Sequence, residues 1–321
     1  MARPLALSGQ RRELAFAALF LVVWIGAPFW RIATLRAVNI QDDIYASDLW
    51  NDRLPARAFV GRTIARGELP LWTPGIYTGF PALADVEFGA LYPSNLLLFG
   101  SLPPYVAFAY AQLLPLFLAG LGVHLLARRL GIGRGGSLLA SGAFALSGFF
   151  VCHLRQLNMI DAACWIPFVL LGVEKLLATP RAPALAMLAL VWAVQCLAGH
   201  PQISYFTALA LVPYTVARWR IVRAGETGRG LGLLDWVRVF VTDRSVLAVV
   251  LGVALGTVIA AIQLLPGLEL AALSHRRGGF PYEQAAAFPA AAGSALTFLI
   301  PYWNGDPATD TFRGSGLFWE Q

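Results

Sequence analysis

The sequence has few charged residues for its length. Only 13% of its 321 residues are Asp, Glu, Lys or Arg, whereas a soluble domain normally carries roughly a quarter. Hydrophobic residues make up 58% of the chain, and its mean hydropathy is +0.64. This composition excludes an ordinary soluble domain and predicts an all-α polytopic membrane protein.

Cysteine and short catalytic motifs are also scarce. Cys152, Cys164 and Cys196 lie in or beside apolar runs and form no CxxC pair, which excludes a disulfide framework and a cysteine zinc site. The chain has no GxxxxGK[ST], HExxH or GxSxG motif, and no GxGxxG that opens a βαβ unit. ATP-driven transport and serine or zinc hydrolysis therefore have no local support.

Long apolar runs, in contrast, are abundant. Runs of about 20 residues mark candidate membrane spans, and they predict about seven transmembrane helices. The predicted spans are 13–30, 104–127, 136–152, 159–177, 183–199, 202–217 and 245–266. The first run is longer than the apolar core of a signal peptide, which favours a retained first helix.

The distribution of charge predicts the orientation. Fourteen of the 24 basic residues lie near span ends on the side of the N-terminus, and 12 of the 18 acids lie in residues 31–102 and 267–321. By the positive-inside rule, we expect a cytoplasmic N-terminus and two extracytoplasmic segments in a cytoplasmic (inner) membrane. The net charge of +6 then reflects topology and gives no reason to expect nucleic-acid binding.

Two parts of the chain follow from these spans. Residues 1–266 are predicted to form a transmembrane helical domain with a large first extracytoplasmic loop at 31–102. Residues 267–321 form a second extracytoplasmic segment without a closing element, which suggests an N-terminal portion of a larger protein. A loop as long as the first is uncommon without a function.

The first loop begins with the acid-rich stretch QDDIYASDLWNDRLP, which contains Asp42, Asp43, Asp48 and Asp52. If residues 46–66 form a helix, Asp48 and Asp52 share one face, and several arginines follow them. One interpretation is a salt-bridged amphipathic helix on the membrane surface. The other is a general base or metal-binding carboxylate at the mouth of a membrane cavity.

Four further pairs of polar residues are predicted on the same side of the membrane. Prolines and glycines exclude a continuous helix between residues 67 and 100, where Asp85 and Glu87 either cap a short helix or join Asp48. Single histidines at span ends are usually satisfied interfacial residues, but several clusters at one face favour a shared cavity. The remaining candidates are His153 with Arg155, His200 with Gln202, and the pair Arg276 and Arg277. Paired arginines suit phosphate, although lipid headgroup contact explains them equally well.

Several short motifs, in this order, resemble the YfhO family of bacterial multi-pass membrane proteins. They are SDLWNDRLP, GELPLWTPGIYTGFPALAD (with Thr73 where Asn is usual), LYPSNLLL, AGHPQISYF and LLPGLELAALSHRRG, within residues 40–305. The resemblance implies a fold like the GT-C glycosyltransferases. Such enzymes transfer a sugar from a polyprenyl-phosphate carrier on the outer face, use an acidic residue of the first outer loop, and in some cases bind a divalent metal.

The resemblance also implies roles for the candidates. Asp48 heads the family-like motif and is the expected base, with Asp43 in reserve, while Arg276 and Arg277 are expected to bind the carrier phosphate. The remaining expected substrate-binding residues are Asp85, Glu87, His153, Arg155, His200 and Gln202. Expected partners are a polyprenyl-phosphate-linked sugar, membrane lipids and an envelope polymer or lipid acceptor, and a divalent metal has no assigned ligands.

Two alternatives remain open at this point. One is a non-catalytic scaffold for envelope assembly. The other is a lipid or polysaccharide transporter or flippase, which favours ionisable groups at mid-membrane depth and repeated halves. Asp161, Glu174 and Gln112 are the polar groups in the predicted spans that bear on transport, and the sequence has no visible internal repeat.

Overall fold

The computed structural model describes most of the chain. The described residues are 7–39, 47–223, 233–274, 277–279, 281–286, 292–300, 303–305, 311 and 313. Within these ranges the chain is helical or irregular, with one isolated antiparallel bridge between Thr73 and Phe80. The all-α prediction is therefore confirmed for the described part of the chain. Two compact units are present, Met1–Glu269 and Leu270–Gln321.

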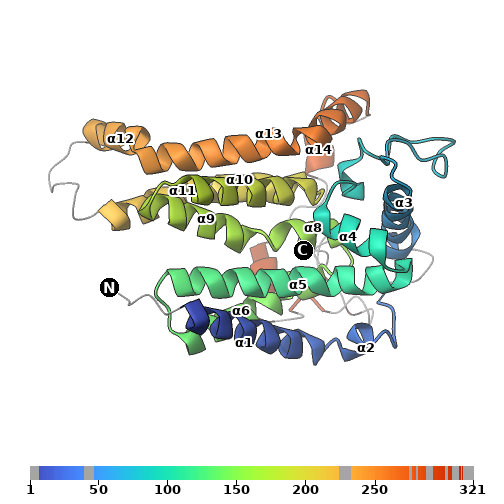
Figure 1. Cartoon of the computed structure of the whole chain (residues 1–321). Coiled ribbons are helices and arrows are strands. Elements are labelled where there is room, and N and C mark those ends of the chain that lie inside the picture. Colours follow the sequence, from blue (N-terminus) through green and yellow to red (C-terminus); the bar gives the residue numbers. More distant parts are fainter. Residues whose placement is uncertain are drawn as a thin grey trace. The chain divides into compact units, whose positions relative to one another are not determined.

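The helices of the first unit are shown in Figure 1. They are α1 (Leu7–Gly26), α2 (Trp30–Ala33), η1 (Leu49–Arg53), α3 (Leu54–Ala65), η2 (Val86–Phe88), α4 (Pro93–Ser101), α5 (Pro104–Arg129), α6 (Arg134–Ala145), α7 (Gly148–Cys152), α8 (Leu157–Ala163), α9 (Ile166–Ala178), α10 (Ala182–Leu197), α11 (Pro201–Arg223), α12 (Leu233–Thr242) and α13 (Arg244–Leu273). The second unit contains the C-terminal end of α13, then α14 (Tyr282–Ala285) and η3 (Ala292–Phe298).

Helix α5 is the centre of the first unit. It packs against α1, α6 and α9, and α9 in turn packs against α10 and α11. Small residues on α5, such as Ala107, Ala111 and Ala119, are buried and allow this close packing. Gly256 serves the same purpose on α13, because a Cβ atom there would overlap the carbonyl oxygen of Ala189 on α10.

Three segments are long and apolar enough to cross a membrane. They are Pro104–Arg129, Arg134–Cys152 and Arg244–Leu273, and Ala182–Leu197 is a shorter apolar helix. These segments agree with four of the predicted spans. The first predicted span corresponds to α1, which begins before Arg11 and Arg12 and therefore carries charge in its first turns.

One predicted span is wrong in its continuity. Residues 159–177 were expected to form one helix, but the structure ends α8 at Ala163 and begins α9 at Ile166. Pro167 lies in the first turn of α9, where the missing N–H of proline would have no helical partner in any case. The proline thus starts a second helix inside the range that was predicted as one span.

The loop at 31–102 is largely ordered. The expected helix over 46–66 is present as η1 followed by α3, and no continuous helix occurs between residues 67 and 85. Ala56 and Val60 of α3 are buried against Ala82, Phe88 and Ala90 in a small hydrophobic core. Helix α4 then packs against both α3 and α5, which ties the loop to the helical unit.

Candidate functional site

Four segments contribute side chains to one polar group. They are η1, η2 with the residue before it, the turn before α8 and the turn before α11. We call Asp52, Arg53, Asp85, Glu87, His153 and His200 the loop cluster. Arg53 Nη2 donates to Glu87 Oε2, and Arg53 Nη1 lies 3.4 Å from Asp52 Oδ2. Glu87 and Asp52 are about half exposed, with side-chain exposures of 51% and 46%. The cluster therefore faces solvent or substrate on one side.

Asp85 has a structural role in this cluster. Its Oδ1 accepts a hydrogen bond of 2.9 Å from the backbone N–H of Glu87 and so caps η2. Burial raises the pKa of Asp85, although this hydrogen bond opposes the rise. The interpretation that Asp85 caps a short helix is correct, and Asp85 also lies within electrostatic range of Arg53 and Asp52.

The two histidines of the cluster have different proton arrangements. His200 Nδ1 accepts a hydrogen bond of 3.3 Å from Ile203 N–H at the start of α11. Burial lowers the pKa of His200, while the charge of Glu87 opposes this, and a neutral ring agrees with an accepting Nδ1. His153 Nδ1 lies 2.6 Å from the carbonyl oxygen of Phe149 and must donate to it, because a carbonyl oxygen only accepts.

Asp48 lies one helical turn before Asp52. It has helical dihedral angles at the start of η1 and its side chain is exposed. Within the described ranges no hydrogen bond or ion pair involves its carboxylate. Asp48 is thus an accessible carboxylate beside the loop cluster, and Asp43 lies outside the described residues.

The other predicted site residues are not members of the loop cluster. Gln202 is exposed in the first turn of α11, and Arg155 is half-buried between α7 and α8. Arg277 is exposed and belongs to the second unit, and Arg276 lies outside the described residues. A phosphate site at the two arginines therefore stays a prediction.

The turn at Gly199 attaches α10 and α11 to the loop. Gly199 has φ of +86°, and a Cβ atom there would overlap the carbonyl oxygen of Val86. Asn158 on α8 donates a hydrogen bond of 3.1 Å to the Gly199 carbonyl. Glycine allows both the positive φ and the close approach, which explains its place in the AGHPQ motif before His200.

A second attachment comes from Gln263 on α13. Its Oε1 accepts from Leu91 N–H at 3.2 Å, and its Nε2 donates to the Val86 carbonyl at 3.3 Å. Gln263 is 1% exposed, so this amide satisfies two backbone groups of the loop inside the protein. Sequence reasoning assigned it no role, although a single buried amide in an apolar helix is itself a signal of a specific hydrogen bond.

A buried ion pair lies beneath the loop cluster. Arg57 Nη2 on α3 is 2.8 Å from Asp161 Oδ2 on α8, and the two side chains are 1% and 3% exposed. Arg57 Nε and Nη1 have no hydrogen-bond partner among the described residues. The signal that sequence reasoning missed is an arginine between the apolar residues Ala56 and Ala58, one turn after Arg53.

The polar groups of the predicted spans that bear on transport have structural partners. Asp161 pairs with Arg57, and Gln112 Oε1 accepts from Asn39 at 2.8 Å. Glu174 receives Arg218 Nε at 2.5 Å, Arg218 Nη2 at 2.9 Å and the Tyr214 hydroxyl at 2.9 Å. The contacts of Asp161 and Glu174 join neighbouring helices, and the contact of Gln112 joins α5 to the segment that follows α2.

The described residues do not contain a metal site. No group of three His, Cys, Asp or Glu side chains within them lies close enough to hold a metal ion. The loop cluster has three carboxylates, but Glu87 pairs with Arg53 and Asp85 caps η2. A divalent metal therefore stays a prediction without assigned ligands.

Comparison with known families gives one match. The family model described as bacterial membrane protein YfhO matches residues 96–296, which is more than half of the chain. No curated protein and no solved structure matched the sequence. The matched range contains His153, Arg155, His200 and Gln202, and the apolar helices α5 to α13.

Proposed function

The chain belongs to the YfhO family of bacterial membrane proteins, and from this premise we propose that it is a membrane glycosyltransferase. It would transfer a sugar from a polyprenyl-phosphate carrier to a cell-envelope acceptor. The observation that carries the proposal is the loop cluster, in which four segments bring carboxylates, a guanidinium and two imidazoles beside the accessible Asp48.

The proposed chemistry needs one proton acceptor. A sugar acceptor hydroxyl loses its proton as its oxygen attacks the anomeric carbon, and a positioned carboxylate can take that proton. Asp48 suits this role because its side chain is exposed and has no described ion pair. Asp52 lies on the same helical segment but is engaged by Arg53.

The leaving group is the carrier phosphate, which gains negative charge as the glycosidic bond breaks. Guanidinium groups stabilise such charge through several directed donors, and we assign this role to Arg276 and Arg277. His200 and Glu87 would hold sugar hydroxyls, since His200 Nδ1 already bonds the backbone and leaves Nε2–H as a donor, and Glu87 is half exposed.

A GT-C-like arrangement of seven spans accompanies this proposal. The three long apolar segments would be joined by α1, α10, α11 and the pair α8 and α9. The loop cluster would then face the extracytoplasmic side. In a chain freed of native cysteines, Thr78→Cys should react with a membrane-impermeant thiol reagent in intact cells, and Arg181→Cys should not.

The function is tested in bacterial cells that lack their own copy of the gene. Asp48→Asn should abolish a surface glycan that the wild-type chain supports, measured by mass spectrometry of envelope polymers and lipids. Asp52→Asn is the matched control, because it removes a carboxylate four residues away that is already paired with Arg53. An unchanged glycan in normally expressed Asp48→Asn would remove Asp48 as the base. Loss of the glycan in Asp43→Asn alone would move that role to Asp43, and no loss in either variant would favour a non-catalytic role in envelope assembly.

A further inference from the structure

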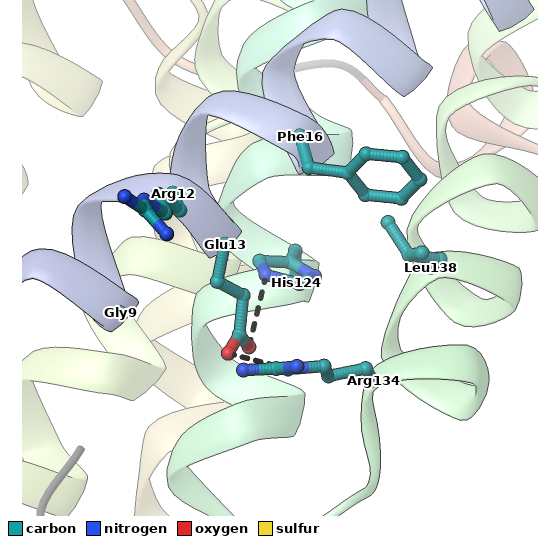
Figure 2. Close-up of a pocket in the computed structure, with 7 residues that line it drawn as sticks. All are labelled: Gly9, Arg12, Glu13, Phe16, His124, Arg134 and Leu138. Carbon is teal, nitrogen blue, oxygen red and sulfur yellow. Dashed lines mark hydrogen bonds and ion pairs between the residues drawn. The ribbon is translucent and has the colours of Figure 1, made fainter.

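A pocket lies at the opposite end of α5 from the loop cluster. Its cavity volume is about 370 Å³, and its walls include Arg12, Glu13 and Phe16 of α1, His124 of α5, and Arg134 and Leu138 of α6 (Figure 2). His124 is twenty residues along α5 from Pro104, which places it about 30 Å from the α4 end of that helix. The pocket is therefore separate from the proposed catalytic site.

Glu13 organises the polar part of this pocket. Its Oε1 lies 2.5 Å from Arg128 Nε, its Oε2 lies 2.9 Å from Arg134 Nε, and His124 Nε2 is 3.9 Å from Oε1. Arg12 is exposed and has no ion pair with a described residue. Arg128 and Arg134 thus hold the carboxylate of Glu13, and the pocket, which Arg12 also lines, has an excess of positive charge.

The wall of the pocket also contains an unused polar atom. The His124 side chain is 3% exposed, and its Nδ1 is buried without a hydrogen-bond partner among the described residues. Buried polar atoms normally have a partner. An unpaired imidazole nitrogen in a cavity wall indicates that a polar ligand atom completes the site.

The pocket has a polar side and an apolar side. Phe16 follows Arg12 by four residues on α1, and Leu138 follows Arg134 by four residues on α6, so each apolar side chain lies about 6 Å further along its helix. Figure 2 shows Phe16 and Leu138 together on one side of the opening, and Glu13 meeting Arg134 on the other. A charged side next to an apolar side matches the head and tail of a lipid.

We propose that this pocket binds an anionic phospholipid. Arg12 and Arg134 would hold the phosphate, to which guanidinium donates several hydrogen bonds. His124 would form a hydrogen bond with a headgroup or ester oxygen. The start of an acyl chain would lie against Phe16 and Leu138. This site concerns the lipid environment of the protein and is independent of sugar transfer.

The experiment uses the whole chain in a neutral detergent and phosphatidylglycerol as the probe. Retained lipid is counted by native mass spectrometry, with phosphatidylcholine as the neutral comparison. Arg12→Gln should weaken phosphatidylglycerol binding about tenfold, the effect expected from losing one charge-assisted contact. Leu138→Trp should weaken binding by a similar factor because the larger side chain fills the cavity. The matched controls are Arg11→Gln and Leu139→Trp, whose side chains are exposed beside the pocket and should leave binding unchanged.

Three results would overturn the proposal. Equal retention of phosphatidylcholine would remove the need for an anionic head group. Equal binding by Arg12→Gln and Arg11→Gln, together with normal binding by Leu138→Trp, would place the lipid elsewhere. Displacement of phosphatidylglycerol by millimolar inorganic phosphate would assign the pocket to free phosphate instead.

Discussion

The two ends of the first unit arrange charge in opposite ways. The loop cluster has three carboxylates, those of Asp52, Asp85 and Glu87, around the single guanidinium of Arg53. At the other end of α5, two guanidinium groups, those of Arg128 and Arg134, hold the single carboxylate of Glu13, and Arg12 lies in the same pocket. Long apolar helices keep the two surfaces apart (Figure 1). An acid-rich end suits proton abstraction from a hydroxyl, and an arginine-rich end suits phosphate.

The ends also differ in how their buried carboxylates are paired. Asp161 and Arg57, beneath the loop cluster, are almost fully buried. Glu174 is similarly buried, but its partner Arg218 is 26% exposed and Tyr214 shares the carboxylate. Removing the arginine should therefore lower the stability more at the loop end, because the Asp161 carboxylate left behind is buried and has no second side-chain donor among the described residues.

The largest loss of stability is expected from Arg57→Met. It leaves Asp161 buried without its counter-ion and should lower the free energy of unfolding by about 3–5 kcal/mol, seen as a reduced unfolding temperature in detergent. Arg218→Met should cost less, about 1–3 kcal/mol. Arg57→Met with Asp161→Leu should recover most of the loss, and failure to recover would mean that packing around Arg57 matters more than its charge.

The next largest loss of stability is expected at the turn that positions His200. Gly199→Ala adds a Cβ that overlaps the Val86 carbonyl and forces alanine to a φ of +86°, which together should cost about 2–4 kcal/mol. Gly100→Ala, where nothing lies within 4 Å of the added atom, is the control. Equal unfolding temperatures for the two variants would show that the loop does not depend on this contact.

A smaller effect is expected from Gln263→Leu. The change leaves Leu91 N–H and the Val86 carbonyl without their side-chain partner, at a cost of about 1–3 kcal/mol. Hydrogen exchange of residues 86–91 should increase while that of α6 stays constant. Protection that is unchanged at 86–91 would contradict the role of Gln263 in holding the loop.

The smallest effect on stability is expected from Glu87→Gln. The pair with Arg53 is half exposed, and exposed pairs contribute at most about 1 kcal/mol. Its effect on sugar transfer should be larger than its effect on the unfolding temperature. The reverse result would make Glu87 a structural residue only.

The sequence predicted the helical class, the position of the long loop and several helix ends. The period and the length of an apolar run are local properties of the sequence. Helices α5, α10 and α13 could therefore be located from their own residues. The contacts that build the loop cluster are between segments more than thirty residues apart, such as Arg53 with Glu87 and Val86 with Gln263. Spacing along the chain carries no information on such contacts. For the same reason the burial of Arg57 was not foreseen, whereas the break before Pro167 has a local cause in the proline itself.

The central claim is that Asp48 accepts a proton during sugar transfer at the acid-rich end. The direct measurement is transfer of labelled sugar from polyprenyl-phosphate-linked sugar in membrane vesicles that contain equal amounts of wild-type, Asp48→Asn or Asp52→Asn chain. We expect Asp48→Asn to lower the rate by about 10²–10⁴ and Asp52→Asn to have little effect. Equal rates for the wild type and Asp48→Asn would contradict the claim.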